Sequence, residues 1–265
     1  MTPVALTIAG SDPSGGAGLQ ADLKTFHQFG VYGEAVVTLI TVQNTLGVTR
    51  VDSLAADLVA AQIRAVLDDI PPHAAKTGAL GSKEVVATVA DAAAAFPFPL
   101  VVDPVMISKH GAKLLDDDSA RLFIDRLLPR AFLLTPNLDE AAAITGLVVD
   151  DRESMIRAAQ KLIALGASNV LVKGGHLAGD ALDVLLTSSG EIYEYSAARV
   201  ATPHTHGSGC TYSAAITAEL AKGTALVDAV KLAKDFITRA IATNPELGRG
   251  QGPLNHHTPS FVEKN

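Results

Sequence analysis

The 265-residue sequence contains a single cysteine, Cys210, and this shortage excludes two classes of site. One thiol can form neither an internal disulfide framework nor a metal site of several thiolates, so a reducing cytoplasm is the expected setting. The eight histidines include no HExxH zinc pattern, and His256 and His257 are expected to form a solvated tail. The phosphate-loop pattern GxxxxGKS/T is also missing, which excludes a P-loop.

Excess positive charge and long apolar runs are lacking as well. The formal net charge of -7 gives no electrostatic footprint for nucleic acid or an anionic membrane, so an anionic ligand must be held locally. The sequence starts without a basic leader, and no segment approaches the roughly 18 apolar residues of a membrane span. We therefore expect a soluble, cytoplasmic protein with neither a nucleic-acid nor a membrane partner.

Apolar residues make up 48% of the chain, although tryptophan is absent and aromatic residues are sparse. Short Val/Ile/Leu runs bounded by Gly, Pro or Asn are typical of strands covered on both faces. Such runs occupy residues 4–10, 35–42, 100–104, 131–137 and 169–175, and apolar stripes with helical spacing lie at 58–70 and 155–165. This alternation predicts parallel βα units, and no repeat or linker divides them, so residues 1–265 are expected to form one α/β domain.

Polar residues that end the predicted strands are the first candidates for a site, because ligands bind beyond the carboxyl ends of parallel strands. In chain order they are Asp12, Gln43, Asn44, Asp103, Asn137 and Lys173. Asp103 suits a hard cation or its waters, or a plain turn. Asn137 and Glu140, three residues apart at a helix start, suit either a ligand site or a helix cap.

Two loops are rich in glycine. The first fits the pattern GxGxxA at Gly16, Gly18 and Ala21, but the acid that a dinucleotide fold needs at the next strand end is replaced by Gln43, so a plain turn is equally good. The second, "HTHGSGCTYSAAITAELAKG", places glycines before a helix, where unpaired N–H groups and the helix dipole favour an anion. This segment therefore predicts a phosphate-binding turn.

Cys210 lies in the first turn of that predicted helix. The same field stabilises a thiolate, so we expect a lowered pKa and a thiol able to accept a proton at neutral pH. The alternative is a small buried residue, and the flanking glycines favour the first interpretation.

Seven segments together resemble the hydroxymethylpyrimidine/phosphomethylpyrimidine kinases of thiamin biosynthesis, within the ribokinase superfamily. They are "LTIAGSDPSGGAGLQADLKTF", "VQNTLGV", "KTGALG", "VVDPVM", "LLTPNLDEAAAITG", "VLVKGGHL" and the glycine-rich segment around Cys210. The resemblance runs from about residue 4 to 255. It implies a three-layer α/β/α ribokinase-like fold with a central, mostly parallel sheet, and a homodimer.

The resemblance also implies the chemistry, which is ATP- and Mg²⁺-dependent phosphorylation of 4-amino-5-hydroxymethyl-2-methylpyrimidine and then of its monophosphate. It makes the turn of Gly207, Ser208 and Gly209 the anion hole. Cys210 then stands where sugar kinases carry a catalytic aspartate, and is the candidate general base.

The remaining roles follow from the same resemblance. Asn137 and Glu140 match the NxxE motif that organises magnesium and phosphate. Asp103 is a third candidate near the metal because of its place at a strand end, and not because of the resemblance. The resemblance places Lys173 near the nucleotide phosphates, although a lone lysine at a strand end is more often merely solvated. It makes Thr205 a nucleotide contact, whereas the neighbouring His206 is expected only to pack the turn. Asp22 and Gln43 surround the pyrimidine, and a carboxamide complements the adjacent amino group and ring nitrogen of that ring.

Two alternatives stay open. A bacterial type of pyridoxal kinase is similar in sequence to this family, and a nucleotide-binding module without catalysis is a third possibility. The set of Cys210, Asp103, Asn137 and Glu140 argues against the module, because binding alone needs no base.

The sequence departs from the family pattern at "VMISKHGAKLL" (105–115) and at His204 and Ser208. The first departure affects the expected substrate preference and closure of the site rather than the core chemistry.

Overall fold

The computed structural model describes residues 2–105, 116–175, 177 and 179–260, and within them the chain forms one sheet of nine strands. The strand order is β3-β2-β1-β4-β5-β6-β7-β8-β9. Six central strands are parallel: β2 (Tyr32–Asn44), β1 (Val4–Ser11), β4 (Ala74–Thr77), β5 (Leu100–Val102), β6 (Leu133–Leu134) and β7 (Val170–Gly174). The antiparallel strands β3 (Gly47–Ser53), β8 (Ala181–Leu186) and β9 (Ile192–Ala197) lie at the two edges.

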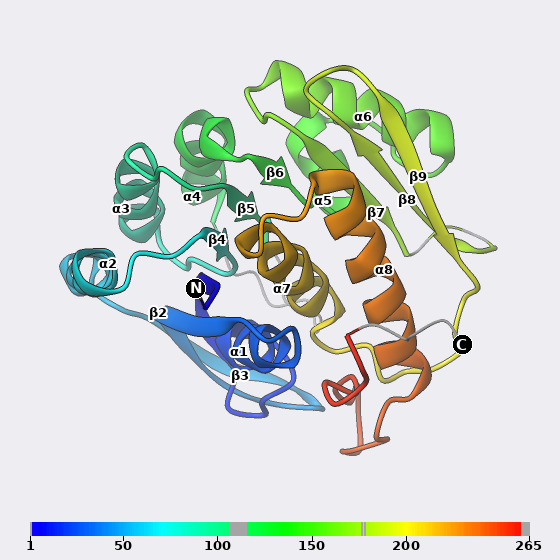
Figure 1. Cartoon of the computed structure of the whole chain (residues 1–265), viewed down its shortest axis with the longest axis horizontal. Helices are drawn as coiled ribbons and strands as arrows, with labels where there is room; N and C mark the ends of the chain where they lie inside the picture. The colour runs from blue at the N-terminus through cyan, green and yellow to red at the C-terminus, as the bar shows by residue number, and fades with distance from the viewer. Residues whose placement is uncertain (1, 106–115, 176, 178, 261–265) are drawn as a thin grey trace.

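Helices cover both faces of this sheet, which confirms the predicted three-layer α/β/α fold (Figure 1). One face carries α1 (Gly18–Gln28), α7 (Ser208–Ala221) and α8 (Leu226–Ala242). The other face carries α2 (Ala56–Asp69), α3 (Lys83–Ala93), α4 (Asp117–Leu122), which continues into the short turns η1 (Phe123–Leu127) and η2 (Leu128–Arg130), then α5 (Leu138–Thr145) and α6 (Arg152–Ala164).

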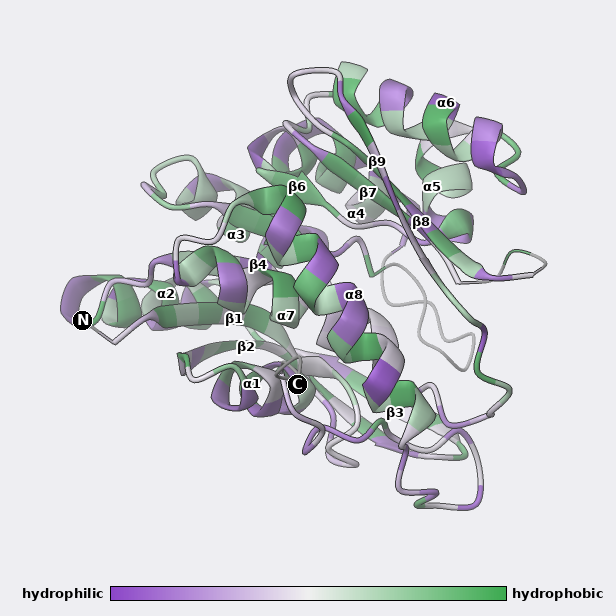
Figure 2. Cartoon of the chain, turned by 45° about the vertical axis from the view of Figure 1, so that its right-hand side comes forward, coloured by the Kyte–Doolittle hydropathy of each residue, from purple (hydrophilic) through white to green (hydrophobic). Residues whose placement is uncertain are grey.

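The parallel strands β1, β4, β5, β6 and β7 each contribute side chains to two hydrophobic cores, one on each face of the sheet. In β1, Leu6 and Ile8 pack into the core under α2 and α3, while Ala5, which precedes Leu6, packs into the core under α1 and α7. Burying a side chain of this size stabilises the fold by about 1.5–3 kcal/mol. This double coverage is the reason why the central strands read as continuous apolar runs, and Figure 2 shows the apolar residues gathered along them.

The edge strand β9 was missed by the sequence analysis for the opposite reason. In β9, exposed and half-buried residues alternate along the strand, so it contains no continuous apolar run. The helices predicted at 58–70 and 155–165 are confirmed as α2 and α6. The run at 131–137 is a strand over Leu133–Leu134 alone.

Helix α7 lies against the middle of the sheet and is buried from Thr211 to Ala221. Its N-cap is Gly207, which has a φ of 79°; a Cβ there would lie 1.9 Å from the carbonyl oxygen of Gly16. Only glycine fits this conformation and this contact. The two glycine-rich loops of the sequence therefore touch each other at the start of α7.

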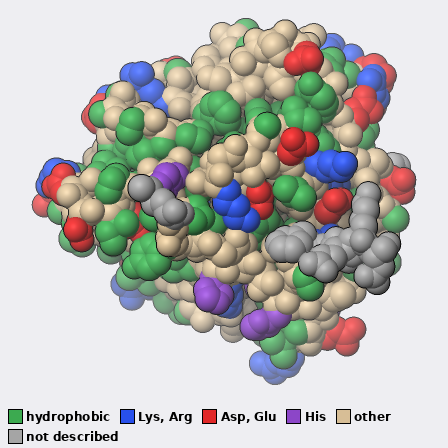
Figure 3. Space-filling view, viewed as in Figure 1, with side chains coloured by type: hydrophobic (Ala, Val, Ile, Leu, Met, Phe, Trp, Pro, Cys, Tyr) green, Lys and Arg blue, Asp and Glu red, His purple; other side chains and the backbone are tan. Residues whose placement is uncertain are grey.

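The described helices include none long and apolar enough to cross a membrane. On the face seen in Figure 3, acidic and basic side chains are interspersed, and the described residues of this face form no continuous basic patch. The divergent loop at 106–115 lies outside the described residues.

Candidate active site

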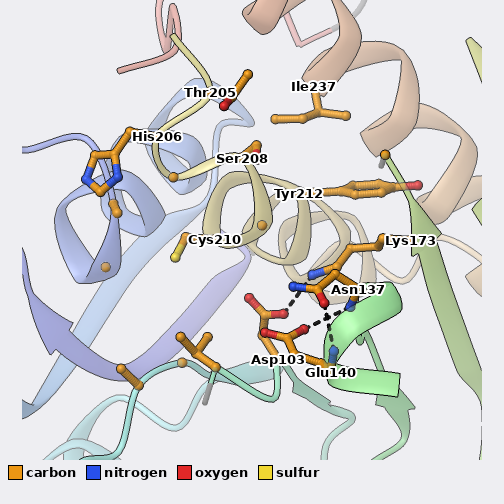
Figure 4. A pocket seen from close by; sticks show the side chains of 18 of the residues that line it. Asp103, Asn137, Glu140, Lys173, Thr205, His206, Ser208, Cys210, Tyr212 and Ile237 are labelled. Atoms are coloured by element: carbon orange, nitrogen blue, oxygen red, sulfur yellow. Dashed lines mark hydrogen bonds and ion pairs between the residues drawn. The ribbon is translucent and has the colours of Figure 1, made fainter. Parts of the chain in front are cut away.

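A cavity of about 1010 Å³ lies at the carboxyl ends of the parallel strands, beside the N-terminus of α7 (Figure 4). It is lined by every predicted site residue except Asp22: Gln43, Asp103, Asn137, Glu140, Lys173, Thr205, Gly207, Ser208, Gly209 and Cys210. The residues come from four strand ends and one turn that are far apart in the sequence. The fold therefore brings the predicted residues together in one place.

Asp22, which is expected to contact the substrate, is the exception because it does not line the cavity. Asp22 is completely buried, and its carboxylate lies 2.8 Å from the Nζ of Lys76, which is also fully buried. The hydroxyl of Thr7 donates to the same carboxylate at 2.6 Å. Asp22 and Lys76 thus form an ion pair beneath the cavity wall, next to Cys210.

Cys210 is half-buried in the first turn of α7, where the backbone N–H of Gly18 donates to its sulfur. The expected lowering of its pKa is wrong. Burial raises the pKa of the thiol to about 11; the charge of Lys76 lowers it, whereas Asp22 and Asp103 raise it further. The helix field and the nearby lysine do not offset the loss of hydration and the two carboxylates, so the free protein holds a neutral thiol.

A titration of the thiol tests this correction directly. Because the folded-state pKa lies near 11, alkylation of Cys210 by iodoacetamide should stay slow through pH 9 and rise toward a midpoint near pH 11. The thiol is the only one in the chain, so the signal is unambiguous, and urea-unfolded protein supplies the ordinary midpoint. A midpoint below about pH 8.5 in the folded protein would contradict the effect of burial.

A lysine and two carboxylates face the N-terminus of α7 across the cavity. The Nζ of Lys173 lies 2.9 Å from Oδ1 of Asp103, which also accepts from the hydroxyl of Thr135 at 3.1 Å. Burial raises the pKa of Glu140 to about 7; the charge of Lys173 opposes this rise and that of Asp103 adds to it. The cluster therefore combines the ammonium of Lys173 with two carboxylates that lie close enough for the charge of Asp103 to raise the pKa of Glu140.

Asn137 and Glu140 form a capping box at the start of α5. The N–H of Glu140 donates to Oδ1 of Asn137 and the N–H of Asn137 donates to Oε2 of Glu140, both at 2.8 Å. The helix-cap interpretation of this motif is therefore confirmed. The cap also fixes the Glu140 side chain beside Lys173 and Asp103, as Figure 4 shows.

The donor set fits a divalent cation that is shared with a phosphate ligand. Among the described residues no group of three or more His, Cys, Asp or Glu side chains is placed to hold a metal alone. The described lining nevertheless contains six carboxylates, of Asp12, Asp103, Asp117, Asp139, Glu140 and Asp183, against three cations, of Lys173, Arg199 and Lys234. An anionic ligand in such a cavity needs extra positive charge, and Mg²⁺ is typically held by one or two carboxylates together with substrate phosphates.

Gly209 leaves room for that ligand over the lysine. A Cβ at this position would lie 3.4 Å from Nζ of Lys173 and 3.6 Å from Oδ2 of Asp103. A side chain would therefore occupy the space above the ion pair. The turn predicted as an anion hole opens onto the cationic group of the site.

The far end of the cavity was missed by the sequence analysis. Its lining includes Tyr212, Ile237 and Ile241, and a buried ion pair in which Nζ of Lys234 lies 2.7 Å from Oδ2 of Asp183. One feature of the sequence could have indicated this end of the cavity. Lys234 lies within the apolar stripe of α8, where most of the residues at helical spacing belong to the core. This end of the cavity therefore presents apolar side chains against which a planar ring can pack.

Three further segments meet at the near end of the cavity. Nε2 of His206 lies 2.9 Å from Oδ2 of Asp12, a contact that joins the turn before α7 to the end of β1. The N–H of Gln251 donates to the carbonyl of Thr45 at 2.8 Å, and the N–H of His206 donates to that of Gly252 at 3.1 Å. The segment around Gln251 therefore bridges the β2–β3 turn and the turn before α7.

The expected solvated tail is wrong for one of its two histidines. His256 is buried, and its Nε2 lies 3.0 Å from the hydroxyl of Thr211 in α7. Burial lowers the pKa of His256 to about 4, so the ring is neutral near pH 7.

A three-layer ribokinase-like fold, with a glycine turn at a helix N-terminus facing a lysine and two carboxylates, defines a small-molecule kinase. Known proteins agree with this class. The family model described as phosphomethylpyrimidine kinase matches residues 12–255, and the chain belongs to that family.

Individual relatives cover nearly the whole chain. The hydroxymethylpyrimidine/phosphomethylpyrimidine kinase of Haemophilus influenzae is 48% identical over 256 residues, which are 95% of each chain. The crystal structure of phosphomethylpyrimidine kinase from Clostridium difficile is 44% identical, with a TM-score of 0.81 over 91% of this chain and 100% of that one. Bacillus subtilis pyridoxal kinase, solved as an ADP complex, is 38% identical, with a TM-score of 0.89 over 97% and 98%.

Proposed function

We propose that this protein transfers the terminal phosphoryl group of ATP to the hydroxymethyl group of 4-amino-5-hydroxymethyl-2-methylpyrimidine, and then phosphorylates the monophosphate to the diphosphate. The observation that carries the proposal is that one continuous cavity runs from Gln43 past Cys210 to Lys173 and Ile237. Its volume of about 1010 Å³ is at the upper end for ligand sites and leaves room for two substrates. Family membership supplies the substrate class.

The chain's own residues divide the work along this cavity. Gln43 faces the pyrimidine, and the apolar end at Ile237 accepts the base of the nucleotide. The N–H groups of the turn at 207–209 and the ammonium of Lys173 stabilise charge that develops on the transferred phosphoryl group. Cys210, beside the same turn, is the base for the substrate hydroxyl, and Thr205 lines the nucleotide side.

Cys210 begins as a neutral thiol, so its use as a base requires the thiolate to be stabilised locally. Lys76 is in place to do so, because its charge lowers the pKa of the thiol. The N–H of Gly18 also donates to the sulfur and favours the same form. Phosphoryl transfer has a loose transition state, so the base needs to accept only one proton, late in the reaction.

Asp103 and Glu140 would hold Mg²⁺ together with the nucleotide phosphates, and the bound ion would offset phosphate charge. We expect Glu140→Gln to raise the magnesium concentration needed for half-maximal rate by about tenfold or more, with little effect on pyrimidine KM. Glutamine keeps an oxygen that can accept from the N–H of Asn137, so the helix cap survives and the charge alone is removed.

A magnesium titration at saturating ATP measures this effect. Asp139→Asn, which removes a neighbouring charge outside the capping box, is the matched control. Unchanged half-saturation and maximal rate in Glu140→Gln would show that this carboxylate is not near the metal.

The function is tested by one product-resolved assay with ATP and Mg²⁺. Hydroxymethylpyrimidine, its monophosphate and pyridoxal are supplied in parallel, and the phosphorylated products are separated. The proposal expects both pyrimidines to be phosphorylated far faster than pyridoxal. A preference for pyridoxal would instead assign the activity named for the Bacillus subtilis relative.

We also propose that the protein is a homodimer that pairs through β2 and β3. Ile40 and Val42 project from the same side of β2 and are 48% and 51% exposed, and Leu46 in the adjoining turn is 56% exposed. Such an apolar patch beside an edge strand is suited to burial by a second copy.

Ile40→Glu should give monomers in sedimentation velocity, because it places a charge in this patch. Val148→Glu, at an exposed apolar residue between α5 and α6, is the control and should leave the dimer intact. A wild-type monomer would refute the proposal.

A further inference from the structure

His206 is a buried polar side chain at the cavity wall to which the proposed reaction assigns no step. It directly precedes Gly207, the N-cap of α7, and is 5% exposed. Its Nε2 lies 2.9 Å from Oδ2 of Asp12, which ends β1 and is itself 2% exposed. An apolar side chain would fill this space without the cost of burying two polar groups, so the pair indicates a task beyond packing.

Asp12 is fixed in one orientation on its own side of the contact. The N–H of Ser14 donates to Oδ1 at 2.8 Å, and the hydroxyl of Ser14 donates to both oxygens, at 2.7 and 2.9 Å. The N–H of Ala17 donates to Oδ2 at 2.8 Å. Burial raises the pKa of Asp12, but the hydrogen bonds from His206 and Ser14 outweigh it and hold the pKa well below its usual range. The ionised carboxylate can only accept, so Nε2 of His206 carries the proton and donates it.

The turn that carries His206 is packed just as closely against the first glycine-rich loop. A Cβ at Gly16 would lie 2.7 Å from Cδ2 of His206, and a Cβ at Gly207 would lie 1.9 Å from the carbonyl oxygen of Gly16. The backbone N–H of His206 donates to the carbonyl of Gly252 at 3.1 Å. The hydrogen bond from His206 to Asp12 therefore fastens the turn before α7 to a rigid support.

The place of this contact in the chain determines what it can control. Gly207, the next residue, has a left-handed φ of 79° and begins the turn at 207–209. The N–H groups of this turn can stabilise charge on a phosphoryl group only while they keep their direction, because such stabilisation depends on donors that are oriented in advance. An anchor one residue before the turn restricts the movement that would misdirect them.

We propose that His206 is a positioning residue for phosphoryl transfer, which holds the turn at 207–209 in its productive conformation by anchoring it to Asp12. Both ends of this anchor line the cavity. The inference rests on the proposed function, because it assigns the turn to the phosphoryl group that is transferred. ADP lacks that group, so loss of the anchor should lower kcat and leave ADP binding nearly unchanged.

Two substitutions of His206 test the anchor. His206→Leu keeps much of the volume but removes the donor, and we expect it to lower kcat by about 10- to 100-fold. His206→Gln supplies an NH₂ group that can reach Asp12, so its kcat should stay close to that of the wild type. Steady-state kinetics at saturating ATP measure kcat, and titration calorimetry measures the Kd for ADP.

His204→Leu is the matched control for these variants. It removes a second ring from the same turn, but Nδ1 of His204 accepts from the N–H of Gly252 at 3.1 Å. The control should therefore leave kcat close to that of the wild type. A near-normal kcat in His206→Leu, or a His206→Gln variant as slow as His206→Leu, would overturn the proposal. A Kd for ADP that weakens as much as kcat falls would also overturn it, because the role of His206 would then be structural.

A double-mutant cycle shows whether His206 acts through Asp12. Asp12→Ala removes the acceptor, so His206→Leu, Asp12→Ala and the double variant should lose kcat by similar factors if the anchor is the cause. Losses that multiply in the double variant would show that the two residues act separately, against the proposal. A wild-type enzyme that prefers pyridoxal would refute only the proposed substrate, because the same variants are then compared on pyridoxal.

The contact can also be measured in the wild-type protein, which keeps the proposal testable even if His206→Leu fails to fold. In a sample labelled with ¹⁵N-histidine, the Nε2–H signal of His206 is assigned by its loss in His206→Gln. This proton should exchange slowly with solvent, because both of its partners are buried. Rapid exchange would refute the anchor.

Discussion

Cys210→Ala is expected to lower kcat by about 10²- to 10⁴-fold and to leave the fold and ATP binding nearly unchanged, since this is the usual effect of removing a positioned general base. The sulfur lies at the first turn of α7, beside the glycine turn at 207–209 and near the Asp22–Lys76 pair. Alanine removes the proton acceptor but disturbs none of the backbone N–H groups of the turn. Single-turnover phosphorylation of hydroxymethylpyrimidine at saturating ATP measures the loss.

Cys210→Ser is the matched control for size. A serine hydroxyl has a far higher pKa than a thiol, so this variant should lose nearly as much activity as the alanine variant although it fills the same space. Near-normal kcat in Cys210→Ala would mean that alignment and charge neutralisation carry the reaction alone, and that Cys210 is only a small residue fitted into the turn.

The second large effect is expected at Lys173, because it is the cation that faces the turn of α7. Lys173→Met should reduce kcat by about 10²- to 10³-fold, a loss comparable with that of one oxyanion-hole donor. It should also lower the free energy of unfolding by about 3–5 kcal/mol, because Asp103, only 3% exposed, would keep its charge without its partner at 2.9 Å. Urea unfolding and steady-state kinetics at a temperature where the variant is folded measure the two effects separately.

The double variant Lys173→Met/Asp103→Asn separates stability from catalysis. It removes the unpaired buried charge and should regain most of the lost stability, yet its activity should stay low. If activity recovers together with stability, Lys173 supports the fold of the site and does not act on the phosphoryl group.

The location of the site could be predicted because it depends on a rule of topology. Gln43, Asp103, Asn137 and Lys173 each follow a short apolar run, and the carboxyl ends of parallel strands lie at one edge of a sheet. The glycine turn at the N-terminus of α7 was likewise predicted from the glycines that precede a helical segment. These features are local, or they follow from the direction of neighbouring strands.

The electrostatic behaviour of the site could not be predicted, because distant residues control it. The pKa of Cys210 depends on burial and on Lys76, Asp22 and Asp103, and nothing in the spacing of these residues indicates that they meet. The partner of Asp22 is 54 residues away, and the contact between Asp12 and His206 joins residues 194 positions apart. The field at the N-terminus of α7 favours the thiolate of Cys210, as expected. Burial has the larger effect, and it raises the pKa of the thiol.

The contact of residues 250–252 with the β2–β3 turn has a consequence for biosynthesis. Gly250 bonds to Thr45, which precedes it by 205 residues, and Gln251 supplies part of the cavity wall. A growing chain can thus assemble most of its sheet while the pocket still lacks one side. Residues 250–252 must therefore have left the ribosome before this side of the cavity can form, so the candidate site is completed only after its whole sheet has been synthesised.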